Sequence, residues 1–204
     1  MDIDICSLCR RSPALLLLFT LGCASQESQE LGVPRLSNRG KSMKVVSSGF
    51  EDNATLDVKF SVEGADISPP LAWSEVPAET KSFALICDDP DAPSPRRPAA
   101  EPWVHWVIFN IPPDRSELPE GIGNTLRPEA LPEASQGKNS WPNDNVGYRG
   151  PAPPPGSGPH RYFFKIYALD AMLNLEAGAT KQQLLEAMSG HVVAEAQLVG
   201  IYER

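Results

Sequence analysis

Positively charged residues are scarce in this 204-residue chain, in which 18 lysines and arginines stand against 26 acidic residues and three histidines. The formal net charge is −8, and the basic residues form no cluster. A nucleic-acid backbone or an anionic membrane surface as main partner would require such a cluster. We therefore expect no nucleic-acid partner, and contact with a membrane only through an N-terminal lipid.

Three common catalytic motifs are also missing, namely G-x-S-x-G, the P-loop and H-E-x-x-H. No internal repeat of roughly 20 to 50 residues is visible, which argues against a solenoid or a propeller. The 21 prolines and 15 glycines are many, but an apolar fraction of 41% argues against disorder. We expect one domain that is not an enzyme and that holds neither a cofactor nor a metal.

Cysteine is rare, and three of the four cysteines fall in the first 24 residues. This segment resembles an export signal, because Arg10 and Arg11 precede an apolar run at residues 14–21 and small residues follow it. Cys23 stands where a bacterial lipobox places its lipidated cysteine. The sequence predicts an exported protein, either a membrane-anchored lipoprotein or a periplasmic or extracellular one. Cleaved secretion without a lipid and no export at all stay open as alternatives.

After the export signal, residues 25–42 are polar and without a period, which predicts a tether before a domain at residues 43–204. Cys6 and Cys9 form a C-x-x-C pair inside the signal, where chance explains their spacing. Cys87 ends an apolar run, so we expect a buried thiol without a disulfide.

The domain is predicted to consist mainly of strands. Polar and apolar residues alternate at residues 56–62, as in a half-buried strand. Residues 83–87 and 104–111 are more continuously apolar, which favours central strands covered on both faces. Residues 160–169 form a further strand. Strands do not alternate with helices, so we expect an antiparallel β-sandwich.

Helix is predicted only near the C-terminus. Thr180 and Gln183 have the spacing of a capping box, and Gly190 can end the helix that they begin. A further helical turn is predicted at residues 192–197. His191 directly follows Gly190, so we expect it to cap the helix or to lie in solvent.

Ionisable residues gather at the ends of the predicted strands. The two-residue period places His160 and Tyr162 on one face of their strand. His105 lies in so apolar a run that it needs a partner, and Asp89, at the end of the preceding strand, is the candidate. We also expect Asp91 to pair with Arg161 and so to support the site.

Three motifs carry a family resemblance: DPDAP at residues 89–93, WVHW through NIP at residues 103–112, and GPAPPPGSGPHRY at residues 150–162. The chain resembles the phosphatidylethanolamine-binding protein family, and most of all its bacterial Raf kinase inhibitor-like branch. The resemblance implies an antiparallel β-sandwich with a small anion pocket. The residues that match the pocket are Asp89, His105, His160 and Tyr162, with Pro153 and Pro154 at the rim.

The leading functional hypothesis is non-enzymatic binding of a small anionic or phosphorylated ligand, such as a phospholipid headgroup. Two histidines can supply donors and positive charge. Asp89 fits beside an anion if it keeps a histidine charged or accepts the ammonium of a ligand such as phosphoethanolamine. An extracytoplasmic inhibitor or regulator of a protease or signalling enzyme, acting through the pocket rim, is the alternative. Hydrolysis by an aspartate and two histidines is a third hypothesis.

Overall fold

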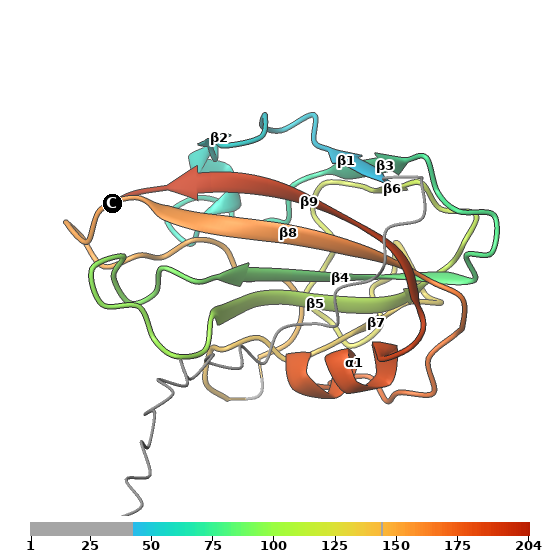
Figure 1. The fold of residues 1–204 in the computed structure, drawn as a ribbon. Helices are drawn as coiled ribbons and strands as arrows, with labels where there is room; N and C mark the ends of the chain where they lie inside the picture. Colours follow the sequence, from blue (N-terminus) through green and yellow to red (C-terminus); the bar gives the residue numbers. More distant parts are fainter. Residues whose placement is uncertain (1–42, 144) are drawn as a thin grey trace, which may run out of the picture. The chain divides into compact units, whose positions relative to one another are not determined.

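Two β-sheets form the domain, which we describe from a computed structural model over residues 43–143 and 145–204 (Figure 1). The predicted export signal, the tether and Cys23 lie outside these residues. The smaller sheet has the order β1-β3-β6, with strands Lys44–Val46, Leu71–Ser74 and Glu117–Leu118. The larger sheet has the order β2-β9-β8-β4-β5-β7, with strands Ala54–Thr55, Val192–Tyr202, His160–Leu169, Ser82–Asp89, Trp103–Ile111 and Ser135–Gln136.

Strand β4 lies at the centre of the larger sheet, between β8 and β5, and all eight of its residues are buried. This explains the continuously apolar run at residues 83–87, because side chains on both faces pack against other layers. The predicted strands at residues 83–87, 104–111 and 160–169 are confirmed. All neighbouring strands are antiparallel except β2, which pairs with β9 in parallel.

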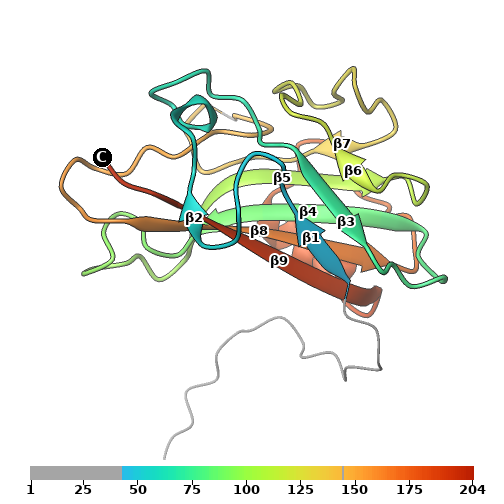
Figure 2. The same ribbon diagram turned by 90° about the horizontal axis from the view of Figure 1, so that it is seen from above.

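One face of the larger sheet packs against the smaller sheet, and Figure 2 shows β1 and β3 lying across β8 and β9. Trp73 of β3 contacts Phe83 of β4 with ring centroids 5.1 Å apart. Cys87 belongs to this core and is a free, buried thiol, as predicted. The sandwich predicted from the sequence is therefore present.

The opposite face of the larger sheet packs against helix α1, Lys181–Met188. Thr180 and Gln183 form the predicted capping box, because each side chain accepts a hydrogen bond from the other's backbone N–H. Leu184 and Met188 are the buried residues of the helix. They belong to a second cluster of buried apolar residues, between the helix and the larger sheet. No helix of the described residues is long and apolar enough to cross a membrane.

Two predicted elements are wrong. Residues 56–62 form a 3₁₀ turn, Val58–Phe60, because the Asp57 side chain accepts a hydrogen bond from the Lys59 N–H (2.8 Å) and begins a helical turn. Residues 192–197 belong to β9 rather than to a helical turn. Pairing along the whole of β8 gives this segment a strand partner, which a reading of local sequence cannot detect.

Candidate functional site

Three neighbouring strands of the larger sheet, β8, β4 and β5, have ends that lie side by side. Asp89 is the last residue of β4, and Trp103 opposite it is the first residue of β5. His160 is the first residue of β8, which runs antiparallel to β4 on its other side. The sheet register therefore brings together residues that lie up to 71 positions apart in the sequence.

A pocket with a volume of about 370 Å³ opens at these strand ends. That size lies within the range of small-molecule sites. All six residues predicted to bind a ligand line it. The complete lining comprises Asp89, Ala92, Pro93, Ala99, Glu101, Trp103, His105, Trp141, Ala152, Pro153, Pro154, His160 and Tyr162.

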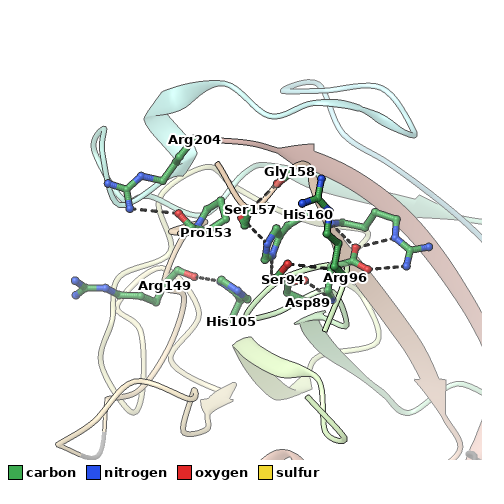
Figure 3. Close-up of polar contacts among 12 residues, drawn as sticks. Asp89, Ser94, Arg96, His105, Arg149, Pro153, Ser157, Gly158, His160 and Arg204 are labelled. Atoms are coloured by element: carbon green, nitrogen blue, oxygen red, sulfur yellow. Dashed lines mark hydrogen bonds and ion pairs between the residues drawn. The ribbon is translucent and has the colours of Figure 1, made fainter. Parts of the chain in front are cut away.

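Asp89 and His160 form a buried pair, with 2.7 Å between Oδ2 of Asp89 and Nδ1 of His160 (Figure 3). The exposed fractions of the two residues are only 3% and 1%. Oδ1 of Asp89 accepts a second hydrogen bond from the Asp91 N–H (2.7 Å). Burial raises the pKa of Asp89, while the hydrogen bond from His160 acts in the opposite direction. Two hydrogen bonds thus fix the orientation of the Asp89 carboxylate, and His160 is the histidine that it contacts.

His105 reaches the pocket through a β-bulge. The register between β4 and β5 shifts between Cys87 and Asp88, so that Cys87 pairs with Trp106 and Asp88 with Val104. His105 is left between these pairs, and its side chain joins the pocket although neighbouring Trp106 fills the core on the same side of the sheet. Bulges commonly re-aim one side chain in this way.

The predicted pairing of His105 with Asp89 is wrong. Nδ1 of His105 lies 2.7 Å from the carbonyl oxygen of Arg149 and donates its hydrogen there. The imidazole packs edge-on against Trp141 and Tyr162, each with ring centroids 4.9 Å away. Burial lowers the pKa of His105 to about 4, so the ring is neutral near pH 7 and its Nε2 carries a lone pair.

Tyr162 contributes a hydroxyl with no hydrogen-bond partner among residues 43–143 and 145–204. The residue is 1% exposed and lines the pocket. Burial raises the pKa of its phenol well above the usual value, so the oxygen keeps its proton. A hydroxyl that lines the pocket without a protein partner is available to a ligand or to water.

The loop at residues 150–159 forms one side of the pocket, with Pro153 and Pro154 at its rim. Its position is fixed by the chain's last residue, because the Gly156 N–H donates to the carbonyl of Arg204 (2.9 Å). Gly156 and Gly158 have φ of 72° and 97°, which glycine adopts without strain. The prolines stiffen the loop between these points.

The expected ion pair between Asp91 and Arg161 is present. Both carboxylate oxygens of Asp91 accept hydrogen bonds from the Arg161 guanidinium (2.8 and 2.9 Å), and one also accepts the Arg161 N–H (3.0 Å). These bonds tie the loop after β4 to the start of β8. His191 lies apart from the pocket lining and is exposed beside Asp170 (2.9 Å), in agreement with the expectation of a solvent position.

Sequence reasoning missed three pocket residues, Ala99, Glu101 and Trp141, which lie in loops and belong to none of the motifs. Trp103, the first residue of the second motif, lines the pocket as well and is 39% exposed. Trp103 and Trp141 contact each other edge-on, with ring centroids 5.4 Å apart. Their aromatic character was the available signal, but tryptophans are more often found in a core.

Negative charge prevails in the pocket wall. Asp89 and Glu101 line it, whereas no lysine or arginine does, and His105 is neutral near pH 7. The wall otherwise consists of apolar and aromatic residues. Within the described residues, no group of three or more histidine, cysteine or acidic residues is placed to hold a metal ion.

Comparisons with known proteins agree with this fold. The family model described as phosphatidylethanolamine-binding protein matches residues 46–203. A UPF0098 protein from Methanothermobacter thermautotrophicus is 51% identical over 163 residues, which are 79% of this chain and 99% of that protein. The chain therefore belongs to the phosphatidylethanolamine-binding protein family.

Two crystal structures extend the comparison. CT736 from Chlamydia trachomatis, described as a phosphatidylethanolamine-binding protein homologue, is 42% identical, has a TM-score of 0.69, and the match covers 81% of this chain and 99% of that one. YbcL from Escherichia coli, described as a member of the mammalian family, is 30% identical with a TM-score of 0.71, and the match covers 80% and 99%. The family's two-sheet fold is thus common to bacterial relatives.

Proposed function

We propose that the pocket binds a small phosphorylated or anionic ligand of the phospholipid-headgroup type and does not convert it. The observation that carries this proposal is the free Tyr162 hydroxyl in a wall that also holds the Asp89–His160 pair. Phosphate oxygens accept hydrogen bonds only, so they match this donor. His160 is a second candidate contact, because it lines the pocket and its Nε2 lies 3.1 Å from the Ser157 hydroxyl.

The negative wall favours a zwitterion over a simple anion. Free phosphate would meet Asp89 and Glu101 without a lysine or arginine to offset their charge. Phosphoethanolamine carries an ammonium as well, and Glu101 together with the exposed face of Trp103 can accept a cation at the pocket rim. We therefore name phosphoethanolamine as the probe that represents this class of ligand.

Isothermal titration of the full chain with phosphoethanolamine, ethanolamine and inorganic phosphate tests the proposal. We expect phosphoethanolamine to bind most tightly, and Tyr162→Phe to weaken its binding about tenfold through loss of one hydrogen bond to a charged group. Tyr202→Phe is the matched control, because the Tyr202 hydroxyl is hydrogen-bonded to Glu63 outside the pocket (2.8 Å). Equal binding by wild type and Tyr162→Phe would refute the role of this hydroxyl.

Inhibition of a protein partner through the rim stays a prediction from the sequence, as does export. Trp103 is the large exposed residue on which a partner would pack. Intact mass measurement of the purified protein tests the predicted lipid on Cys23. A mass that matches an unmodified cleaved N-terminus would contradict lipidation.

A further inference from the structure

Ser157 extends the Asp89–His160 pair into a chain of three side chains. Its Oγ lies 3.1 Å from Nε2 of His160, and Nδ1 of the same ring lies 2.7 Å from Oδ2 of Asp89 (Figure 3). An ionised Asp89 only accepts, so Nδ1 carries a hydrogen, and Nε2 of the neutral ring accepts one from Ser157. A hydroxyl, an imidazole and an orienting carboxylate follow one another in the order that activates a nucleophile.

The turn that carries Ser157 is well fixed at both ends. The Ser157 N–H donates to the carbonyl of Pro154 (3.0 Å), and the Gly156 N–H donates to Arg204. A side chain added at Gly156 or Gly158 would meet no atom within 4 Å, so the turn is open beside both glycines, and Ser157 itself is half-buried. The only other contact of Oγ within the described residues is a long one of 3.5 Å to the Gly158 carbonyl.

The carboxylate and the imidazole are fixed as well. Asp89 and His160 are 3% and 1% exposed, and they project from adjacent strands, β4 and β8. The second oxygen of Asp89 is occupied by the Asp91 N–H, which prevents the carboxylate from turning away. Rigid positioning of base and orienting group is what separates a reactive serine from an ordinary loop serine.

We propose that Ser157, which contacts the pocket residue His160, is an acylatable nucleophile that hydrolyses small carboxylic esters. Oγ of Ser157 attacks the ester carbonyl carbon while its proton moves to Nε2 of His160. The bond from carbon to the leaving alkoxide then breaks, and the alkoxide takes the proton from His160 and departs as an alcohol. A water molecule attacks the acyl-serine, gives one proton to Nε2, and releases the carboxylic acid as Ser157 regains its hydrogen.

Two further groups suit the other atoms of an ester. The Gly158 N–H, directly after the serine, donates to no acceptor among residues 43–143 and 145–204, and the residue after a nucleophile often supplies an oxyanion donor. The apolar wall of Trp103, Trp141 and Pro153 suits a short acyl or alcohol group. This activity concerns esters, a ligand class different from the headgroup, although both would use the Asp89–His160 pair.

Fluorophosphonate labelling of the full chain, followed by intact mass and peptide mapping, tests the proposal together with hydrolysis of p-nitrophenyl acetate. We expect one label per chain on Ser157, and at least ~100-fold slower labelling and hydrolysis in His160→Ala. Ser157→Ala should lose both reactions. Ser94→Ala is the matched control, because this nearby serine has no histidine contact and instead accepts the Arg96 N–H (3.3 Å); it should behave as wild type.

Absence of a label on Ser157 in the wild type would overturn the proposal, as would hydrolysis that persists in Ser157→Ala, since that would come from an imidazole alone. If thermal unfolding shows that His160→Ala is not folded, Asp89→Asn takes its place, with the same expected loss. Titration with phosphoethanolamine needs no reactive serine, so failure of the labelling and failure of the binding proposal are distinguishable.

Discussion

Two adjacent aspartates of β4 occupy opposite faces of one sheet and differ in every contact they make. Asp88 is directed to the side of α1, where it accepts hydrogen bonds from Lys165 (3.1 Å) and Lys181 (2.5 Å). Asp89 is directed to the pocket, where it meets one histidine. Both are almost fully buried, at 1% and 3% exposed.

The difference shows how a buried carboxylate is used. Two ammonium groups compensate Asp88, and with its charge satisfied it joins helix to sheet. Asp89 has only an imidazole, whose charge depends on its protonation, and it lies in the wall of an open pocket. We therefore assign Asp88 to stability and Asp89 to the site, and the predictions below separate these two roles.

The largest expected effect is a dependence of the protein's stability on pH, caused by His105 in the pocket wall. The folded state holds His105 neutral down to about pH 4, whereas an unfolded chain protonates it near 6.5. The unfolded state thus binds more protons between pH 6.5 and 4. The free energy of unfolding is therefore highest above pH 6.5 and decreases by about 3 kcal/mol as the pH falls toward 4. Urea unfolding of wild type and His105→Gln at several pH values measures the difference.

In His105→Gln the loss between pH 6.5 and 4 should be absent or much smaller, whereas the control His191→Gln, at an exposed histidine, should keep it. Asp89 acts in the opposite direction, because its raised pKa favours the folded state as the pH falls, so the comparison of variants isolates His105. Identical pH profiles for wild type and His105→Gln would contradict the assigned burial effect.

Asp88→Asn should destabilise the protein by about 2 kcal/mol, since it leaves two lysines without their counter-charge; partial exposure of these lysines (32% and 20%) limits the effect. Binding of phosphoethanolamine should not change. Denaturant midpoints measure the first quantity and titration the second. Asp170→Asn, which removes an exposed ion pair, is the control and should alter stability by less than about 0.5 kcal/mol.

Asp89→Asn should show the converse pattern. We expect the affinity for phosphoethanolamine to fall about tenfold, because the His160 ring loses the carboxylate that orients it. The loss of stability should be smaller than in Asp88→Asn, since the substitution also removes an incompletely compensated buried charge. Unchanged affinity would remove Asp89 from the site and abolish the distinction between the two residues.

Arg161→Lys should have the smallest effect. The lysine keeps the charge near Asp91 but loses the paired hydrogen bonds of the guanidinium. Because 53% of the Arg161 side chain is exposed, we expect a loss of stability below about 1 kcal/mol. Thermal unfolding measures this change, and a loss as large as that of Asp88→Asn would show that the Asp91 contact is a main support of the fold.

The sequence predicted the central strands and the capped helix because their patterns are local. It also placed His160 and Tyr162 on one face, since the two-residue period is regular in β8. It could not predict the bulge that turns His105 into the pocket, because the bulge arises from pairing with β4. For the same reason Asp89 was assigned to the wrong histidine.

Loop residues of the site were the least predictable. Glu101 and Trp141 reach the pocket only through the paths of their loops, which no local pattern specifies. Ser157 belongs to the third motif, but its contact with His160 depends on the turn between two glycines of positive φ. Sequence reasoning therefore found the residue types of the site but not the contacts between them.

The most direct test of the proposed pocket uses the three histidines of the chain as probes. Imidazole NMR signals of the full-length protein are recorded during titration with phosphoethanolamine. We predict saturable shifts of His105 and His160, which line the pocket, and none of His191, which lies outside it. Signals of His105 and His160 that stay unchanged at millimolar phosphoethanolamine would contradict the account.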